Sequence, residues 1–353
     1  MQIDLDTFSA MFDGPDLREV SFLGGRPRFV LRSSMFERDE LESLCATARA
    51  IRSLDAHEQG ARLLERVLHR KRVLHLFAQP STRTCESFAT ATARLGGSAR
   101  VLQDLSATSF VKGETIRDTA QVWAASFDLL VLRHPDDRFV LQCAHSLALG
   151  PHTMPMISAG TGTLEHPTQG LLDVFTLLDS LGSLDGRSVA IVGDTSRNRC
   201  ARSLATLLSR FEQIRIAFVS PPEFEPEQAL LESLTARGVR VELHHHLGPL
   251  LAAHGESLDA IYVTRLQQEW DEGEAALLGT SPGLVLDPGY RRFLRPSCRI
   301  LHPLPRVNEL PTEWDDHPGF LIWDQVRNGI WARAALIATL VGADAGLREA
   351  TGA

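Results

Sequence analysis

The sequence predicts an α/β protein built from two doubly wound parallel-sheet domains, and two observations lead to this prediction. Short runs rich in Val, Ile and Leu alternate with stretches of helical periodicity, which is typical of βα units around a buried parallel sheet. The chain is 353 residues long, about twice the length of an average domain. Its 44% hydrophobic and 23% charged residues are typical of a folded globular protein.

Each predicted strand is a short apolar run bounded by polar or glycine-containing sequence. We expect strands at Val73–Phe77, Asp128–Leu132, Met156–Ser158, Ser188–Val192, Ile214–Val219, Val239–Leu243, Ala260–Val263 and Arg299–Leu301. The helices expected between them are Asp39–Ile51, Ser87–Leu95, Ile116–Ala125, Gln169–Leu181 and Cys200–Arg210. Gly182 and Gly186 follow the fourth of these helices and indicate a domain hinge near residues 181–187.

The composition argues against several classes of protein. The 36 Lys and Arg residues against 44 Asp and Glu give a net charge of −8, so we expect no nucleic-acid partner. Because no stretch approaches the ~20 apolar residues of a membrane span, we expect no membrane partner either. The five cysteines contain no C-x-x-C pair, and the acidic start Met1–Gly14 does not resemble a signal peptide. These features favour a reducing, cytoplasmic location.

Two segments resemble cofactor sites, but neither fits one. Gly160–Glu165 begins like a dinucleotide-binding loop, yet Glu165 replaces its third glycine. His244, His245 and His246 are adjacent in an extended segment, so their side chains would alternate between two faces. We therefore expect neither a metal nor an organic cofactor.

Polar and cationic side chains follow several predicted strands, where ligands bind in open α/β sheets. Ser81, Thr82, Arg83 and Thr84 come between a strand and a helix, and the amides of a helix N-terminus favour an anion. Three hydroxyls and a guanidinium there predict a phosphate site. The alternative is a simple helix cap with a surface arginine.

Two further strand ends carry groups that could polarise a carbonyl. Arg133 directly follows its strand, and His166 and Gln169 share one face of the helix that starts beside them. A neutral histidine and an arginine can both donate to an oxygen that gains negative charge. Taken singly, a histidine at such a place is more often structural. Ser109 and Lys112 lie in a loop beside Gly113, which predicts either a lid that delivers a cation or a solvated lysine.

The second half of the chain supplies two arginines after separate strands, Arg199 and Arg265. Each guanidinium can pair with a carboxylate through two hydrogen bonds, which suits a dicarboxylic substrate, although surface ion pairs are the alternative. The segment His302–Arg306 is stiffened by proline, and its exposed carbonyls could accept hydrogen bonds from an amide NH2 group.

In order and spacing, these motifs resemble the aspartate/ornithine carbamoyltransferase family. The resemblance extends from about Val30 to about Gly342, and Pro303 stands where the ornithine branch typically has cysteine, which favours aspartate as acceptor. The motifs concerned are Ser81–Thr84, Lys112–Glu114, Arg133–Pro135, His166–Gln169, Arg199, Thr264–Gln267 and His302–Arg306.

The resemblance implies an enzyme that moves the carbamoyl group of carbamoyl phosphate to L-aspartate, a step of pyrimidine biosynthesis. It implies a carbamoyl-phosphate domain over residues 1–180, with a short extension over about 1–25. An amino-acid domain would cover residues 181–324, with the active site between the two. Residues 325–353 would form a C-terminal helix that returns to the first domain. The assembly implied is a homotrimer with shared active sites, and further assembly of trimers is left open.

The resemblance also implies a role for each matching residue. The phosphate would be held by Ser81, Thr82, Arg83 and Thr84, and the carbonyl would be polarised by Thr84, Arg133 and His166. The amide would be held by Gln169 and by the backbone of Leu304 and Pro305. The aspartate carboxylates would be oriented by Arg199, Arg265 and Gln267, while Ser109 and Lys112 would reach a neighbouring protomer's site.

Four positions depart from the family pattern. Cys85 stands where arginine is usual, Ala89 where glutamate is usual, and Gln268–Trp270 where a lysine and an arginine are common. These departures keep two alternatives open. One is a carbamoyltransferase of specialised metabolism with another amine acceptor, and the other is a non-catalytic paralogue that serves as a structural partner.

Overall fold

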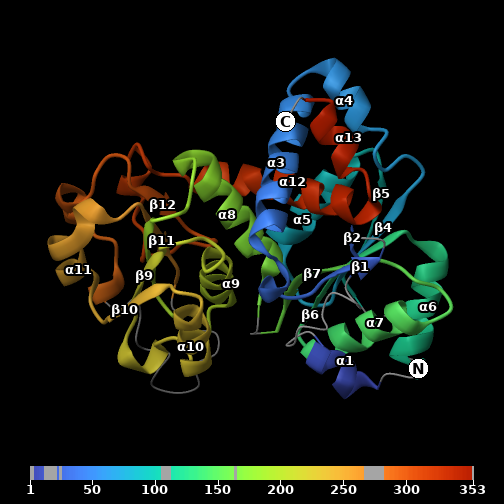
Figure 1. Ribbon diagram of the computed structural model, residues 1–353, viewed down its shortest axis with the longest axis horizontal. Coiled ribbons are helices and arrows are strands. Elements are labelled where there is room, and N and C mark those ends of the chain that lie inside the picture. The colour runs from blue at the N-terminus through green and yellow to red at the C-terminus, as the bar shows by residue number, and fades with distance from the viewer. Residues whose placement is uncertain are drawn as a thin grey trace. The chain divides into compact units, whose positions relative to one another are not determined.

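The structure is a computed structural model that describes residues 4–11, 22–23, 26–104, 113–162, 165–265 and 282–351. The chain divides into two compact units (Figure 1). The first unit comprises Met1–Thr168 and Asn328–Ala353, and the second comprises Gln169–Arg327. Each contains a five-stranded sheet whose neighbouring strands are all parallel. The predicted fold class, two parallel-sheet α/β domains, is therefore confirmed.

The sheet of the first unit has the strand order β3-β7-β6-β4-β5. Its central strands are almost entirely apolar and buried, as expected of a parallel sheet covered on both faces. After β5 the chain returns to the other side of β4, so the strand order reverses between β4 and β6. The strands are β3 (Phe29–Val30), β4 (Arg72–Phe77), β5 (Ser98–Leu102), β6 (Leu129–His134) and β7 (Met156–Thr161).

Helices flank this sheet, and a small antiparallel pair, β1 (Phe22–Leu23) and β2 (Arg26–Pro27), precedes it. One buried cluster joins Phe8 and Leu74 with Leu132 and Leu147, which belong to two helices and two strands. The helices are α1 (Leu5–Met11), α3 (Arg38–Asp55), α4 (Glu58–Leu64), α5 (Thr82–Arg94), α6 (Ile116–Ser126) and α7 (Asp137–Leu149).

The C-terminal segment belongs to the first unit from Asn328 onward. It contains the end of α12 (Ile322–Val341) and the whole of α13 (Asp344–Glu349). On α13, Arg348 Nη1 donates to Ser43 Oγ (2.8 Å) and to Thr47 Oγ1 (2.9 Å), both on α3. These hydrogen bonds fix α13 against a helix some 300 residues earlier in the chain.

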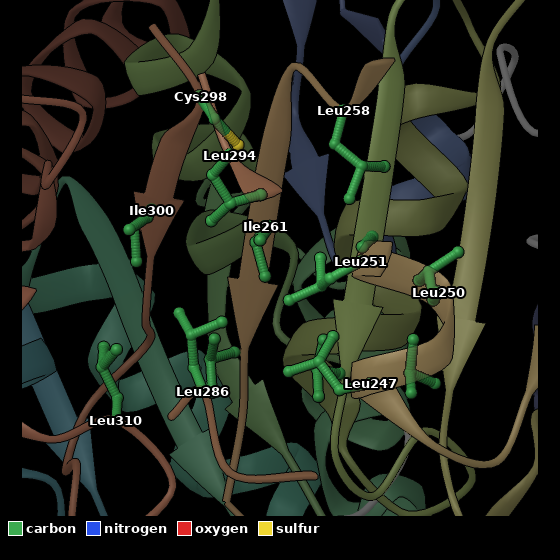
Figure 2. Close-up of a cluster of buried hydrophobic side chains, with 14 of the residues drawn as sticks. Leu247, Leu250, Leu251, Leu258, Ile261, Leu286, Leu294, Cys298, Ile300 and Leu310 are labelled. Carbon is green, nitrogen blue, oxygen red and sulfur yellow. The ribbon is translucent and has the colours of Figure 1, made fainter. Parts of the chain in front are cut away.

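The second unit has the strand order β10-β9-β8-β11-β12, so its order reverses between β8 and β11. Its core packs α11 and the loops before and after β12 against the sheet, as Figure 2 shows. The strands are β8 (Ser188–Val192), β9 (Arg215–Val219), β10 (Arg240–His244), β11 (Ala260–Val263) and β12 (Arg299–Leu301). The helices are α8 (Pro167–Leu181, continued from the first unit), α9 (Arg199–Leu208), α10 (Gln228–Ala236) and α11 (Leu247–His254). In the part of the chain that the structure describes, no helix is long and apolar enough to cross a bilayer.

One helix boundary differs from the prediction in a way that matters for function. Helix α5 begins at Thr82, not at Ser87, so Arg83 and Thr84 lie in its first turn. The prediction started the helix at the first regular apolar spacing. In the structure the N-cap is Ser81 and the helix begins with the next residue. The first turn is polar, so it shows no apolar periodicity from which its start could be predicted.

Candidate active site

The candidate site of the first unit lies at the carboxyl ends of three neighbouring strands. Ser81–Thr84 follows β4, Arg133 is the last residue but one of β6, and His166 comes five residues after the end of β7. Strands β4 and β6 flank the point where the strand order reverses, where parallel sheets bind ligands. The topology therefore brings together residues that the sequence separates by more than 80 positions.

The segment Ser81–Thr84 forms the N-terminus of the 13-residue helix α5. The first intrahelical bond runs from Cys85 N–H to Ser81 O, so the N–H groups of Thr82, Arg83 and Thr84 have no partner inside the helix. Ser81 is the N-cap residue, but its side chain accepts no capping hydrogen bond. Three amides and the positive end of the helix dipole thus meet at one place, which favours a bound anion.

The side chains of this segment are also available to a ligand. Ser81 is half-buried, whereas Thr82 and Arg83 are exposed. Within the described residues, none of these three side chains makes a hydrogen bond or an ion pair. The exposed side chains of Thr82 and Arg83 thus favour the predicted phosphate site, which stays a prediction.

Thr84 and His166 form the buried part of the site. Thr84 Oγ1 lies 3.5 Å from His166 Nε2, and Thr168 Oγ1 lies 3.4 Å from His166 Nδ1. Thr84 and His166 are both less than one-tenth exposed. Because both ring nitrogens are in contact with hydroxyls, the ring orientation is fixed from two sides.

Arg133 approaches the same histidine across a glycine. Its Nη1 donates to Ala159 O at 3.2 Å, and the side chain is only 6% exposed. A Cβ atom on Gly160 would lie 2.9 Å from Arg133 Nη1 and 3.1 Å from the ring of His166. Gly160 also has φ = +103°, which side-chain-bearing residues rarely adopt. Only glycine allows the guanidinium and the imidazole to approach each other here.

The backbone of Arg133 also forms hydrogen bonds with the residues just before Ser81–Thr84. Its carbonyl accepts hydrogen bonds from Ala78 N–H (2.9 Å) and from Gln79 N–H (3.4 Å), which lie just before Ser81. On the other side, an antiparallel bridge between Thr161 and Glu165 returns the chain to the end of β7, where His166 begins the next segment. Glu165 in turn accepts from the backbone N–H of Ser33.

His134 follows Arg133 but has a structural role. Its ring stacks on Phe139, with ring centroids 4.0 Å apart, and burial lowers its pKa. Its Nδ1 accepts from the backbone N–H of Asp136. The two predicted residues of the Gly113 loop, Ser109 and Lys112, lie outside the described residues.

The second unit presents its cations at the ends of β8 and β11, again where the strand order reverses. Arg199 is the first residue of α9, where Asn198 caps the helix by accepting from the backbone N–H of Cys200 and Ala201. Arg265 follows β11 and is half-buried. The two arginines thus stand at adjacent strand ends, whereas Gln267 lies outside the described residues.

Arg197 lies in the same motif as Arg199 but is bound within the unit. Its Nε donates to the fully buried Asp194 at 2.7 Å, and its guanidinium lies 4.3 Å from the ring centroid of Phe224. Gly193 precedes this pair, and a Cβ there would lie 2.2 Å from Thr264 O. This close approach joins the loops after β8 and β11, and the sequence pattern alone does not show it.

The loop after β12 is fixed by His302 and Glu309. Leu304 N–H donates to His302 Nδ1 at 2.8 Å, so Nε2 carries the ring proton and donates to Glu309 Oε1 at 2.9 Å. Burial lowers the pKa of His302 despite the opposing effect of Glu309, and the nearby charges of Arg306 and Arg265 lower it further. The ring is therefore neutral near pH 7.

Leu304 itself has φ = +57°, which is uncommon for a residue with a side chain and costs of order 1 kcal/mol or more. The hydrogen bond to His302 Nδ1 stabilises this backbone conformation. Gln169, at the start of the second unit, donates from Nε2 to the buried Asp173 at 2.9 Å. Asp173 and Gly160 are the two site residues that the sequence analysis missed.

The two described departures from the family pattern lie on α5. Cys85 is fully buried, and burial raises the pKa of its thiol. Ala89 is half-buried. Nearby, Arg333 Nη1 donates to Ser87 Oγ at 2.7 Å, and its guanidinium lies 5.2 Å from the ring centroid of Phe88. A cation from α12 thus supports α5. Gln268–Trp270 lies outside the described residues.

Comparison with known proteins connects both units to one family. Residues 28–179 match the model of the aspartate/ornithine carbamoyltransferase carbamoyl-P binding domain, and residues 185–340 match that of the Asp/Orn binding domain. The aspartate carbamoyltransferase catalytic subunit of Vibrio vulnificus (strain CMCP6) is 36% identical over 306 residues, which cover 86% of this chain and 93% of that protein.

Solved structures give the same result. The catalytic subunit of M. jannaschii aspartate transcarbamoylase superposes with a TM-score of 0.79 at 31% identity, covering 90% of this chain and 99% of that chain. The Trypanosoma cruzi aspartate transcarbamoylase in complex with N-(phosphonacetyl)-L-aspartic acid gives a TM-score of 0.78 at 33% identity. The match covers 88% of this chain and 95% of that chain.

Proposed function

The chain belongs to the aspartate/ornithine carbamoyltransferase family, and on that premise we propose that it transfers the carbamoyl group of carbamoyl phosphate to L-aspartate. The products are N-carbamoyl-L-aspartate and phosphate, and the reaction belongs to pyrimidine biosynthesis. The observation that carries the proposal is the convergence of Thr84, Arg133 and His166 beside the N-terminus of α5. An anion site and a set of oxyanion donors thereby share one place.

The phosphate binds at the start of α5. The N–H groups of the first turn, including that of Thr84, and the hydroxyls of Ser81 and Thr82 donate to its oxygens, and the exposed guanidinium of Arg83 supplies the positive charge. A helix N-terminus and an arginine together neutralise a group that would otherwise be repelled by a chain of net charge −8.

The carbonyl oxygen of the carbamoyl group faces Thr84, Arg133 and His166. When the neutral amine of aspartate attacks the carbamoyl carbon, the C=O electron pair moves onto oxygen and these groups donate to the resulting oxyanion. Each such donor stabilises the transition state by about 3–4 kcal/mol. The electron pair then re-forms C=O, the C–O bond to phosphate breaks, and the proton of the attacking amine passes to the departing phosphate. The proposed chemistry needs neither a metal nor an organic cofactor, because phosphate is already a good leaving group.

The remaining contacts orient the two substrates. The carbamoyl NH2 donates to Gln169 and to backbone carbonyls of Leu304 and Pro305. The carboxylates of aspartate pair with Arg199 and Arg265, with Gln267 beside them. Their position at adjacent strand ends supports this assignment. Holding both substrates in attack geometry contributes roughly 7–11 kcal/mol.

The proposed assembly is a homotrimer in which Ser109 and Lys112 of one protomer complete the site of the next, and trimers could associate further. The support is the family motif Lys112–Glu114, which contains Lys112 and follows shortly after Ser109. We also propose a cytoplasmic location, which is supported by the five cysteines, none of which forms a disulfide.

The test is to incubate the purified protein with carbamoyl phosphate and L-aspartate and to measure both carbamoyl product and phosphate. We expect one phosphate per carbamoyl-aspartate formed, and a rate far above that of the Lys112→Ala variant. Turnover no faster than this variant would reject the proposed function, and only a lack of turnover with every amine tested would favour the non-catalytic paralogue.

A second candidate is the same transfer to another amine, which the unusual sequence at Gln268–Trp270 favours. A panel of amino acids and amines decides between the two. The proposed function requires the highest kcat/KM with L-aspartate, whereas a higher value with another amine would establish the second candidate.

A further inference from the structure

A buried chain of hydrogen bonds in the second unit joins the two groups proposed to hold the carbamoyl NH2. Asp173, one helical turn after Gln169 on α8, is fully buried. Its Oδ1 accepts from Gln169 Nε2 (2.9 Å) and from Gln325 Nε2 (2.6 Å). Its Oδ2 accepts from the hydroxyl of Tyr262 at 2.7 Å. Three donors thus converge on one carboxylate.

The chain continues from Gln325 to the loop after β12. Gln325 Oε1 accepts from His302 N–H at 3.0 Å, and His302 Nδ1 accepts from Leu304 N–H at 2.8 Å. Gln325 and His302 are each 2% exposed, so water does not compete for these bonds. Asp173 is therefore connected to Leu304 through two buried side chains.

The chemistry of the partners fixes the orientation of every amide in this chain. A carboxylate only accepts hydrogen bonds, so both glutamines must turn their NH2 groups toward Asp173. Gln325 then has its oxygen toward His302 N–H, as observed. Gln169, whose NH2 faces Asp173, turns its oxygen away from the carboxylate. The side-chain oxygen of Gln169 is a hydrogen-bond acceptor, which suits the NH2 group of a ligand.

Tyr262 supports the carboxylate and also forms a side-chain hydrogen bond with Gln169, but it is not a link between Asp173 and Leu304. Burial raises the pKa of its hydroxyl, and the charge of Asp173 raises it further, so the phenol keeps its proton and donates. Its removal leaves the connection from Gln169 through Asp173 and Gln325 to Leu304 intact. Tyr262→Phe is therefore a matched control within the same buried cluster.

We propose that Asp173 is a positioning residue for recognition of the carbamoyl NH2. Through Gln169 it orients a side-chain oxygen, and through Gln325 and His302 it holds Leu304 at its positive φ, so that both acceptors meet one NH2 group. This proposal rests on the proposed function, because it assumes that carbamoyl phosphate is the ligand.

The test compares the binding of carbamoyl phosphate with that of acetyl phosphate, in which a methyl group replaces the NH2. Both are titrated calorimetrically into the wild-type protein and into Asp173→Leu, Asp173→Asn, Gln325→Met and Tyr262→Phe. The wild type is expected to bind carbamoyl phosphate at least about tenfold more tightly than acetyl phosphate. The methyl group of acetyl phosphate cannot donate a hydrogen bond to the acceptors on Gln169 and Leu304. Asp173→Leu and Gln325→Met should bring this ratio close to one, while the affinity for acetyl phosphate stays within about threefold.

The two other variants should keep the preference for carbamoyl phosphate. In Asp173→Asn, the amide oxygen can still accept from both glutamines while its NH2 donates to the Tyr262 oxygen. If Asp173→Leu does not fold, Gln325→Met carries the test alone.

The outcomes separate this proposal from the proposed function. An unchanged ratio in a folded Asp173→Leu protein, or an equal loss of affinity for both ligands, overturns the positioning role and leaves the proposed function standing. A wild-type protein that forms N-carbamoyl-L-aspartate but does not distinguish the two ligands overturns the positioning role alone. A wild-type protein that forms no carbamoyl product overturns the proposed function, and the positioning role is rejected with it.

Discussion

Thr84 Oγ1 lies 3.5 Å from His166 Nε2, although the two residues come from different strand ends and lie 82 positions apart in the chain. Thr84 belongs to the first turn of α5, where the phosphate is proposed to bind. His166 lies beside Arg133, from which only Gly160 separates it. The contact therefore joins the phosphate site to the donors proposed for the carbonyl oxygen.

Replacing His166 by alanine should slow the reaction more than it weakens substrate binding. A donor that acts mainly on the developing oxyanion contributes most in the transition state, so kcat should fall about 10²–10³-fold. The KM for carbamoyl phosphate should change less than about tenfold. Steady-state kinetics measures both, and an unchanged kcat would exclude His166 from the chemical step.

Gly160→Ala should reduce activity as strongly as the loss of a catalytic residue. The new Cβ would lie within van der Waals overlap of Arg133 Nη1 and of the His166 ring, so both must move. Gly182→Ala is the matched control, because Gly182 also has positive φ (+79°) but nothing lies within 4 Å of its Cβ position. Both variants share the backbone cost of about 1–2 kcal/mol.

Stability and activity should therefore separate these two glycine variants. We expect similar losses of thermal stability and a kcat/KM at least about 100-fold lower for Gly160→Ala alone. Equal activity of the two variants would show that Gly160 has no special relation to the site.

Arg83→Ala should weaken the binding of phosphate and of carbamoyl phosphate, because it removes the exposed cation from the start of α5. A charged hydrogen bond of this kind contributes about 1.5–3 kcal/mol, or roughly 10–150-fold in Kd. Arg66→Ala removes an equally exposed arginine elsewhere in the same unit and serves as control. Calorimetric titration with inorganic phosphate measures the Kd of both variants. Equal Kd values for Arg83→Ala and Arg66→Ala would place the phosphate elsewhere.

His75 should make the stability of the protein depend on pH. It lies fully buried on β4, and burial lowers its pKa from 6.5 to about 4. Between these values the unfolded chain binds a proton that the folded protein does not, so the unfolding free energy falls as the pH drops from about 6.5 toward 4. The contribution of this one residue is at most about 1.4 kcal/mol per pH unit.

Urea denaturation at about pH 7.5 and about pH 5.5 measures this effect. The loss of stability on acidification should be smaller in His75→Gln than in the wild type, and unchanged in the control His57→Gln, where the histidine is exposed. An identical pH dependence in His75→Gln and the wild type would contradict the assignment.

The central strands could be predicted from the sequence because burial on both faces makes them continuous apolar runs. β8 and β11, two central strands of the second sheet, have the predicted bounds, and so does the edge strand β12. β5 was missed because it is an edge strand whose residues are mostly exposed, so its side chains carry no apolar pattern. β3 was missed because it is only two residues long.

The structure brings together Thr84, Arg133 and His166, which the sequence singles out because polar residues follow apolar strands there, and their roles stay a prediction. Residues whose importance depends on their neighbours in the folded structure could not be predicted from the sequence. Gly160 matters only because Arg133 and His166 approach it. Asp173 stands in the apolar stretch of α8, and an acidic residue there was a signal that buried partners must exist, but it could not reveal Tyr262 and Gln325 as those partners.

The central claim is that cations and helix amides from separate strand ends bind two anionic substrates at one site. A crystal structure of this protein with N-(phosphonacetyl)-L-aspartate tests it most directly. The account predicts the phosphonate within hydrogen-bond distance of the Ser81–Thr84 amides and Arg83, and the two carboxylates on Arg199 and Arg265. A phosphonate bound away from α5, or carboxylates that contact neither arginine, would contradict it.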